Sequence, residues 1–239
     1  MKKAVLIVHG FVGSLYDNEY LMNYLEFDHK FDVFAYTLPG HHPCYDYQKV
    51  NYQTWIDFLN QRIQELINMG YKSVYLIGHS MGGVLIGLTS FNYKEVKKVV
   101  FINAAYNYLN FKQNKIDILT NKDYKDYVEV FDRVFHTSIP FFLEFVKLVK
   151  NNYELLNKVN CEALIIQSDT DQVVPYENGE IIYEKISSKT KYLTYLKDGR
   201  HAVFEGNELE LARKKEVAEY IRLFLRGGYT WHKTWKEKI

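Results

Sequence analysis

The sequence has few of the residues that cross-link or interrupt a chain. Among its 239 residues there are only two cysteines, Cys44 and Cys161, and four prolines. Two cysteines so far apart form neither a disulfide framework nor a metal-ligand spacing, and they suit a reducing compartment. No Gly/Ser-rich linker, low-complexity tract or repeat interrupts the chain. We therefore expect one domain that covers residues 1–239.

Long hydrophobic runs and an excess of one charge are also missing. The N-terminal stretch "MKKAVLIVHG" resembles the start of a secretion signal, but its apolar run from Ala4 to Val8 is too short for one. No segment approaches the roughly 20 apolar residues of a membrane span. The formal net charge of +1 gives no reason to expect nucleic acid as a partner. We expect a cytoplasmic protein without an integral membrane segment, and we make no prediction of its oligomeric state.

The last fourteen residues, "RGGYTWHKTWKEKI", differ in character from the rest. Arg226 and three lysines against one glutamate give this segment a net charge of +3, with aromatic residues interleaved. Such a tail is compatible with binding at a membrane surface. A terminal extension that packs on its own surface or frays is the more common case, and we favour it.

Short β-branched apolar runs alternate with longer amphipathic stretches along the chain. The apolar residues of 52–70 form one helical stripe, and 208–228 has a second such pattern that ends at a glycine pair. This alternation predicts an α/β fold with about six mostly parallel strands and helices on both faces. The expected strands are 4–9, 31–38, 73–78, 96–103, 162–168 and 190–196.

Residues 105–158 break this alternation between the fourth and fifth strands. They hold two or so helical stretches and no clear strand. In parallel sheets the ligand crevice lies beyond the carboxyl ends of the strands. We therefore interpret 105–158 as an insertion over that crevice.

The segment "VYLIGHSMGGVLIGL" contains the pattern G-x-S-x-G as Gly78-His79-Ser80-Met81-Gly82. It lies where a strand ends and an apolar helix begins, which is the setting a nucleophilic serine on a strained turn requires. Small residues at 78 and 82 would let the strand and helix approach each other. A glycine-rich packing turn is the alternative, and candidate partners for Ser80 decide against it.

A serine nucleophile needs a histidine base, and the base needs an acid that orients it. The fifth strand ends in "QSDTDQVVP", where Asp171 is the preferred acid and Asp169 the alternative. Either could instead serve as a turn or helix-cap carboxylate. The sixth strand is followed by "KDGRHAVFEG", and His201 is the only histidine between this strand and the last helix. Asp198 there is expected to shape the turn.

A tetrahedral intermediate also needs oxyanion donors, usually two backbone N–H groups. We expect one from Met81, directly after the nucleophile, and one from Phe11 in the loop "HGFVGS". The Phe11 side chain would then wall the acyl site, or else be an ordinary core aromatic. We also expect Phe11 and His79 to contact the substrate.

Together "IVHGF", "LPGHH", "GHSMGG", "SDTDQVVP" and "GRHAVFEG" resemble the α/β-hydrolase fold, and most closely its small bacterial carboxylesterase and monoacylglycerol-lipase-like branch. The resemblance covers residues 3–225. It implies Ser80 as nucleophile, Asp171 as acid, His201 as base, and Phe11 and Met81 as oxyanion donors. It further implies a helical cap at 105–158 and no metal or organic cofactor.

Three departures from this family stand out. The two N-terminal strands of larger relatives are missing. His42 replaces a usual glycine, and Arg200 precedes the base where a small residue is more usual. We expect the Arg200 side chain to point to solvent rather than into the site.

The expected function is that of a serine carboxylic-ester hydrolase whose partner is a small acyl ester of short or medium chain length. The aromatic residues within 105–158 favour an apolar acyl pocket. A thioesterase or lysophospholipase would use the same triad, and a cofactor-free perhydrolase is a further alternative. A non-catalytic binding module is a distant one. Family members with an aspartate nucleophile are disfavoured because position 80 is serine.

Overall fold

The computed structural model describes residues 3–41, 49–106, 138–204 and 211–228, which contain one six-stranded sheet. All neighbouring strands are parallel, and their order is β2-β1-β3-β4-β5-β6. The predicted α/β fold with six parallel strands is therefore confirmed. The strands are β1 (Lys3–Val8), β2 (Phe31–Ala35), β3 (Val74–His79), β4 (Val96–Ile102), β5 (Glu162–Ser168) and β6 (Lys191–Leu196).

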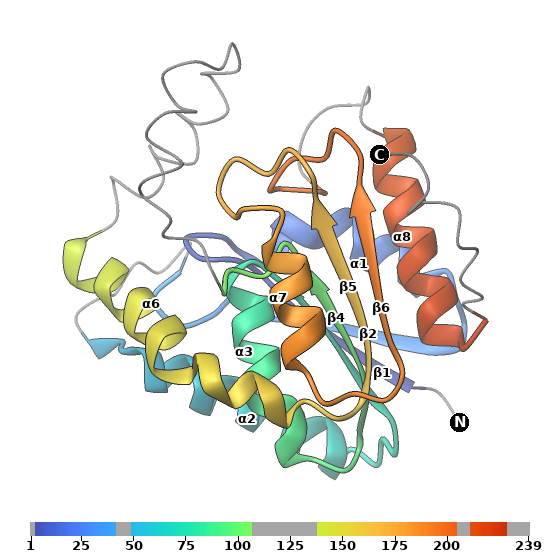
Figure 1. Cartoon of the computed structure of the whole chain (residues 1–239). Coiled ribbons are helices and arrows are strands. Elements are labelled where there is room, and N and C mark those ends of the chain that lie inside the picture. The colour runs from blue at the N-terminus through green and yellow to red at the C-terminus, as the bar shows by residue number, and fades with distance from the viewer. Residues whose placement is uncertain (1–2, 42–48, 107–137, 205–210, 229–239) are drawn as a thin grey trace.

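Helices cover both faces of this sheet, as the nearly continuous apolar strands require. Figure 1 shows α8 on one side and α3 and α7 on the other. The helix α1 packs with α8, whereas α2 and α6 pack with α3. Their bounds are α1 (Glu19–Glu26), α2 (Tyr52–Asn68), α3 (Met81–Thr89), α6 (Ile139–Asn152), α7 (Asn178–Lys185) and α8 (Leu211–Arg226), and the short 3₁₀ turns are η1 (Leu15–Asn18), η3 (Ser90–Asn92) and η4 (Tyr153–Lys158).

The two cores follow from the period-two alternation of the strands. In β1, Val5 and Ile7 join the apolar cluster under α1 and α8. Leu6 and Val8 point the other way and join the larger cluster under α2, α3 and α6. Both sets are almost fully buried, so a one-residue shift in register would exchange the two cores.

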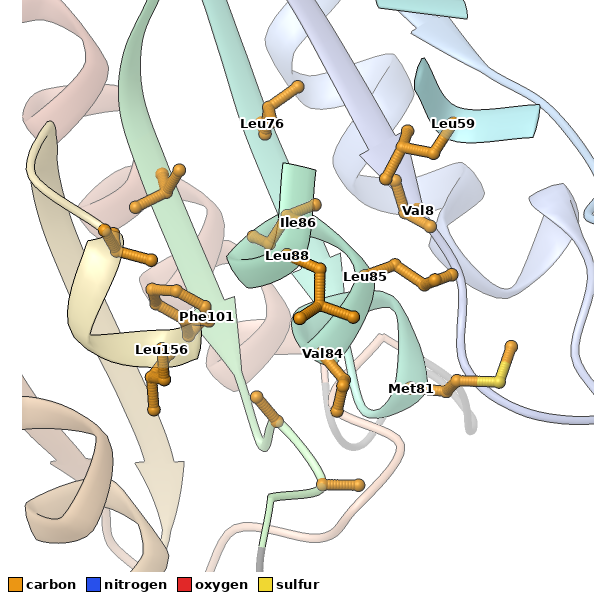
Figure 2. Packing of buried hydrophobic residues seen from close by; sticks show 14 of the residues in the cluster. Val8, Leu59, Leu76, Met81, Val84, Leu85, Ile86, Leu88, Phe101 and Leu156 are labelled. Carbon is orange, nitrogen blue, oxygen red and sulfur yellow. The ribbon is translucent and has the colours of Figure 1, made fainter. Parts of the chain in front are cut away.

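The central helix α3 has no solvent-exposed face. Each of its residues from Met81 to Thr89 is buried, because it packs on the sheet on one side and under α2 and α6 on the other. Figure 2 shows Val84, Leu85 and Leu88 of this helix among side chains from several other elements. A helix that is apolar all round is expected only in such a position.

The helix α2 follows the sequence pattern closely. Asn51 caps its first turn, where the Asn51 side chain accepts a hydrogen bond from the Thr54 N–H. Its buried stripe is Trp55, Leu59, Ile63 and Leu66. Gly70, at φ +97°, then turns the chain toward β3.

Some predicted bounds differ, and some predictions fall outside the described residues. The strand predicted at 31–38 ends at Ala35, because the chain leaves the sheet before Leu38. Within the expected cap 105–158, residues 107–137 are outside the described ranges, and α6 and η4 form the part that is described. Cys44, His42 and the basic tail from residue 229 onward also lie outside them. None of the helices in the described ranges combines the length and apolarity that a bilayer crossing needs.

The strand order brings two loops together at one edge of the sheet. From β1 the chain moves to β2 on one side and then returns to β3 on the other side. The loops that follow β1 and β3 are therefore neighbours at the carboxyl edge, which we define as the edge where all six strands end. This reversal point is where parallel α/β sheets bind ligands.

Candidate active site

Ser80 lies on the sharp turn between β3 and α3. Its backbone has φ +52° and ψ −117°, a conformation that costs a non-glycine residue about 1–3 kcal/mol. Serine is a preferred helix N-cap, yet the Ser80 hydroxyl makes no capping bond to α3. The turn instead is held by its backbone: the Ser80 N–H donates to the Ile102 carbonyl at 3.0 Å. The hydroxyl is thus left for another use.

The small residues around Ser80 are required by close packing of the turn. A Cβ atom on Gly78 would overlap the backbone of Gly82, and one on Gly82 would overlap the Val8 carbonyl of β1. A Cβ atom on Gly10 would lie 3.1 Å from Ser80 Cβ and 3.6 Å from Ser80 Oγ. The missing side chain at position 10 keeps the space beside the hydroxyl open.

His201 and Asp171 form a hydrogen-bonded pair beyond the ends of β5 and β6. His201 Nδ1 lies 2.8 Å from Asp171 Oδ2, and the Asp171 side chain is fully buried. The other carboxylate oxygen accepts the Val173 and Val174 N–H groups at 2.7 and 2.9 Å. Since the carboxylate only accepts, His201 carries its proton on Nδ1, which leaves Nε2 as an acceptor. Asp169, the alternative acid, is exposed.

The described residues contain no hydrogen bond between Ser80 Oγ and the His201 ring. The two residues are held near each other through His79, whose Nε2 donates to the His201 carbonyl at 2.7 Å. The two imidazole rings lie 5.0 Å apart between centroids. Catalytic hydrogen bonds are often long without substrate and shorten when it binds. His79 was predicted to contact the substrate. In the structure its Nε2 is hydrogen-bonded to the main chain of His201, and the substrate contact stays a prediction.

The loop after β1 carries the predicted oxyanion donor Phe11. It turns tightly: the Gly13 N–H donates to the Gly10 carbonyl at 3.2 Å, and Val12 takes φ +54°. His9 holds this loop to the chain after β2, because its Nε2 accepts the Leu38 N–H at 2.9 Å while Nδ1 donates to the Gly10 carbonyl at 2.7 Å. Burial lowers the pKa of His9 to about 4, so its ring stays neutral in this role near pH 7.

The Phe11 side chain enters an aromatic cluster with residues of α6 and α2. Its ring stacks on Phe145 and Phe141 with centroids 4.9 and 5.2 Å apart, and lies edge-on to Trp55. His41 completes the cluster, and burial lowers its pKa to about 3. The Phe11 side chain is therefore packed among aromatic residues, and its role as a wall of the acyl site stays a prediction.

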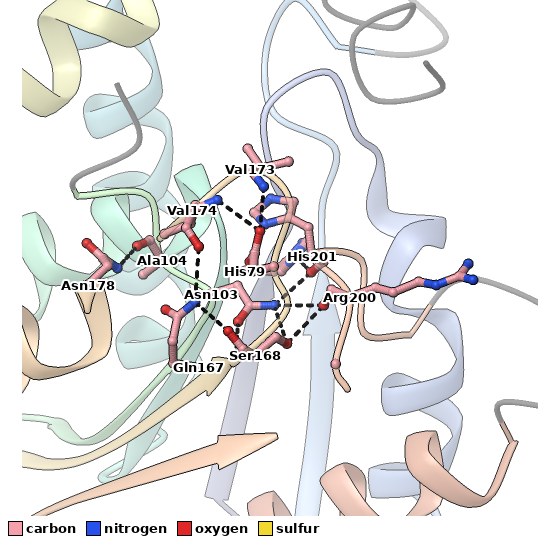
Figure 3. Close-up of polar contacts among 12 residues, drawn as sticks. His79, Asn103, Ala104, Gln167, Ser168, Val173, Val174, Asn178, Arg200 and His201 are labelled. Carbon is pink, nitrogen blue, oxygen red and sulfur yellow. Dashed lines mark hydrogen bonds and ion pairs between the residues drawn. The ribbon is translucent and has the colours of Figure 1, made fainter. Parts of the chain in front are cut away.

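Two polar residues near His201 were missed by the sequence analysis. Asn103 and Ser168 end the apolar runs "VVFIN" and "EALIIQS", and both are fully buried. A polar residue that closes an apolar strand was the available signal. Asp198, at φ +52°, shapes the turn before His201. The Arg200 residue is exposed, and Figure 3 shows its side chain leading away from the other polar groups.

The described residues contain no cluster of three or more His, Cys, Asp or Glu side chains placed to hold a metal ion. The arrangement they do contain is a buried serine hydroxyl that makes no capping bond on a strained turn, a histidine whose Nε2 can accept a proton, and a buried carboxylate behind that histidine. That order of groups suits proton abstraction from the hydroxyl during acyl transfer.

Comparison with known proteins gives consistent matches. A family model described as "alpha/beta hydrolase fold" matches residues 3–137, and one described as "Serine aminopeptidase, S33" matches residues 118–210. The chain is 27% identical to a thermostable monoacylglycerol lipase of Bacillus sp. (strain H-257), covering 83% of this chain and 82% of the relative. It is 22% identical to a carboxylesterase of Bacillus subtilis (strain 168), covering 92% of both. A solved structure described with the metagenome-derived lipolytic enzymes LipS and LipT superposes with a TM-score of 0.73 at 24% identity, over 95% of this chain and 94% of that one.

Proposed function

Because this chain belongs to the α/β-hydrolase fold family, we propose that it is a serine carboxylesterase that cleaves short- to medium-chain acyl esters through an acyl-enzyme on Ser80. The observation that carries the proposal is the buried His201–Asp171 pair, joined at 2.8 Å next to the strained Ser80 turn. A packing turn would need neither the pair nor the strain. The likeness to a monoacylglycerol lipase and a carboxylesterase supports an ester as the substrate.

The proposed reaction has two steps. Ser80 Oγ attacks the ester carbonyl while His201 Nε2 takes the proton of the serine hydroxyl. The resulting oxyanion accepts hydrogen bonds from the Phe11 and Met81 N–H groups. The ester C–O bond then breaks, and His201 returns the proton to the leaving alcohol. In the second step water, deprotonated by His201, attacks the acyl-enzyme. The bond to Ser80 Oγ then breaks, His201 returns the proton to that oxygen, and the carboxylic acid and the free serine result.

The aromatic cluster supports an apolar acyl group. Phe11 both belongs to the loop facing Ser80 and stacks on Phe141 and Phe145 of α6. Rings of this kind offer apolar area and no hydrogen-bond partners for a sugar or a phosphate. The acyl chain is therefore proposed to run from Ser80 toward this cluster, under α6.

A series of p-nitrophenyl esters from acetate to palmitate tests the proposal. We expect a maximum of kcat/KM among the short and medium chains, and a loss of about 10⁴-fold or more in Ser80→Ala. Ser90→Ala is the matched control, because Ser90 is a buried serine at the end of the same helix. No hydrolysis at any chain length, or equal activity in the two variants, would overturn the proposal. Faster cleavage of an acyl-CoA or a lysophospholipid would redirect it to those substrates.

A further inference from the structure

The Asn103 carboxamide lies between the end of β4 and the loop that carries His201. Its Nδ2 is 2.9 Å from the His201 carbonyl oxygen, 3.1 Å from the Arg200 carbonyl oxygen and 3.0 Å from Ser168 Oγ. Its Oδ1 accepts the Ser168 N–H at 2.7 Å, which fixes the orientation of the amide. Figure 3 shows these contacts converging on one side chain. The amide thus links the strand before Asp171 to the residue proposed as base.

Two further donors reach the same carbonyl groups. Ser168 Oγ donates to the Arg200 carbonyl at 2.9 Å, and His79 Nε2 donates to the His201 carbonyl at 2.7 Å. Gly199 allows this approach, because a Cβ atom there would lie 2.7 Å from Ser168 Oγ. The backbone around His201 is therefore held from three directions by side chains of β3, β5 and the residue after β4.

The segment that carries Asn103 also holds the nucleophile. The Ser80 N–H donates to the Ile102 carbonyl at 3.0 Å, and the Ala105 N–H donates to the Ser80 carbonyl at 3.2 Å. Asn103 itself takes φ +44°, a left-handed conformation that asparagine tolerates better than most residues. The residues on either side of Asn103 are thus fixed to Ser80, while its side chain is fixed to His201.

We propose that Asn103 is a positioning residue that sets the His201 imidazole relative to Ser80, with Ser168 and His79 as its partners. This inference rests on the proposed function, since it assigns His201 as the base. Asn103 does not touch substrate. It holds the main chain of the base at a fixed distance from the main chain of the nucleophile, and a misplacement of about 1 Å can cost about a hundredfold in rate.

Two substitutions separate the carboxamide from the backbone conformation. Asn103→Gly removes the amide and accepts the positive φ without strain. Asn103→Asp keeps the shape and the bond to the Ser168 N–H, but it replaces the donor with a carboxylate that faces two carbonyl groups. We expect kcat to fall about tenfold to a hundredfold with KM changed less than about threefold, and Asn103→Asp to be the slower of the two.

Asn178→Asp is the matched control, because Asn178 is an equally buried asparagine whose Nδ2 donates to the Ala104 carbonyl rather than to the His201 loop. We expect it to lose stability without the fall in kcat. Kinetics are measured below the unfolding temperature of each variant, and proton NMR follows the low-field resonance of the His201 Nδ1–H held by Asp171. That signal should broaden or shift in both Asn103 variants and persist in Asn178→Asp.

The inference is overturned if the folded Asn103 variants keep kcat within about twofold of the parent, or if Asn178→Asp reproduces their fall in kcat and their NMR change. If neither Asn103 variant folds, Ser168→Ala decides, because it removes the hydroxyl that contacts the Arg200 carbonyl and Asn103 Nδ2 but keeps the Ser168 N–H bond to Asn103 Oδ1. A fall in kcat of a few-fold at constant KM supports the inference, and an unchanged kcat contradicts it. Failure of the proposed function would give a different result, because Ser80→Ala would then remain active.

Discussion

The carboxyl and amino edges of the sheet differ in backbone strain, because within the described ranges non-glycine residues take a positive φ only at the carboxyl edge. In the described ranges, four non-glycine residues have a positive φ, and all four lie at the carboxyl edge. They are Val12, Ser80, Asn103 and Asp198, which follow β1, β3, β4 and β6. Glycine takes a positive φ at Gly70, before β3 at the amino edge, and also at Gly40, after β2 at the carboxyl edge. A non-glycine residue so placed costs about 1–3 kcal/mol, and asparagine and aspartate tolerate the conformation best. In the described ranges, backbone strain that a glycine would relieve occurs only at the carboxyl edge.

The difference distinguishes turns that only connect elements from turns whose side chains we propose to be functional. The turn before β3 only reverses the chain, so Gly70 meets its requirement. At the carboxyl edge our proposals require the side chains themselves, because glycine supplies neither the Ser80 hydroxyl nor the Asn103 amide. Backbone strain concentrated at a ligand-binding edge is typical of sites that hold side chains in a reactive geometry.

Asp171→Asn gives the largest expected change at the carboxyl edge. The amide would lose either the His201 Nδ1–H bond or the bonds to the Val173 and Val174 N–H groups, so the ring would adopt the wrong tautomer. We expect kcat to fall about 10³–10⁴-fold. Asp169→Asn, two residues away and exposed, should change kcat less than about twofold. Steady-state kinetics on a p-nitrophenyl ester measures both, and an equal loss in the two variants would contradict the assignment of Asp171.

Gly10→Ala tests the open space beside the hydroxyl. The added methyl would lie 3.1 Å from Ser80 Cβ and close to Oγ, where an ester carbonyl has to approach. We expect kcat/KM to fall about tenfold to a hundredfold while the protein stays folded. The control is Gly228→Ala, since a Cβ atom there meets nothing within 4 Å. Full activity of Gly10→Ala would show that esters do not approach over this loop.

His41→Phe tests the buried histidines, His9 and His41, beside the loop after β1. The folded pKa of His41 is about 3 and that of an unfolded histidine about 6.5, so the unfolded chain binds more protons between these values. The free energy of unfolding should therefore fall as the pH drops below 6.5, by up to about 1.4 kcal/mol per pH unit for each such histidine. Phenylalanine removes this slope at position 41, and Trp55 Nε1 still donates to the Pro39 carbonyl.

At pH 5 we expect His41→Phe to be more stable than the parent by about 2 kcal/mol, and at pH 7.5 to differ from it by less than about 1 kcal/mol. Urea unfolding at the two pH values measures both differences. His29→Phe, at an exposed histidine of the loop before β2, is the control and should leave the slope unchanged. An unchanged slope in His41→Phe would show that His41 is protonated in the folded protein.

The smallest effects compare the two edges directly. Gly70→Ala introduces strain at φ +97° and should cost about 1 kcal/mol of unfolding free energy without changing kcat. Val12→Gly relieves strain next to Phe11, and we expect stability within about 1 kcal/mol of the parent but a loss of kcat of about threefold to tenfold. Thermal unfolding and ester kinetics give both values. Lower activity in Gly70→Ala, or none lost in Val12→Gly, would remove the functional distinction between the edges.

The fold was predictable because it depends on local patterns. All six strands were placed within a few residues, since apolar β-branched runs with helical stretches between them favour a mostly parallel sheet. The candidate triad was predictable for a related reason: the carboxyl ends of parallel strands meet, so polar residues after β3, β5 and β6 converge. Asn103 was not recognised because its contacts are with Ser168 and two main-chain carbonyls, and no spacing in the sequence records them.

The strand predicted at 31–38 shows another limit of sequence patterns. Its last residue, Leu38, is apolar, but it is buried outside the sheet, and its N–H donates to His9 Nε2 rather than to a strand. The His9 ring, in the loop after β1, thus takes the place of a strand carbonyl as the acceptor for the Leu38 N–H. Hydrophobic periodicity records burial, and it does not record which group satisfies the backbone.

The central claim is that Ser80 is the nucleophile of acyl transfer. Covalent labelling with a fluorophosphonate, read by intact mass and peptide mapping, tests it most directly. Our account predicts one adduct per chain, on Ser80 in the peptide containing "GHSMGG", with no adduct in Ser80→Ala and with labelling slowed strongly in Asp171→Asn. An adduct on another residue, or labelling of Ser80→Ala at the parent rate, would contradict it.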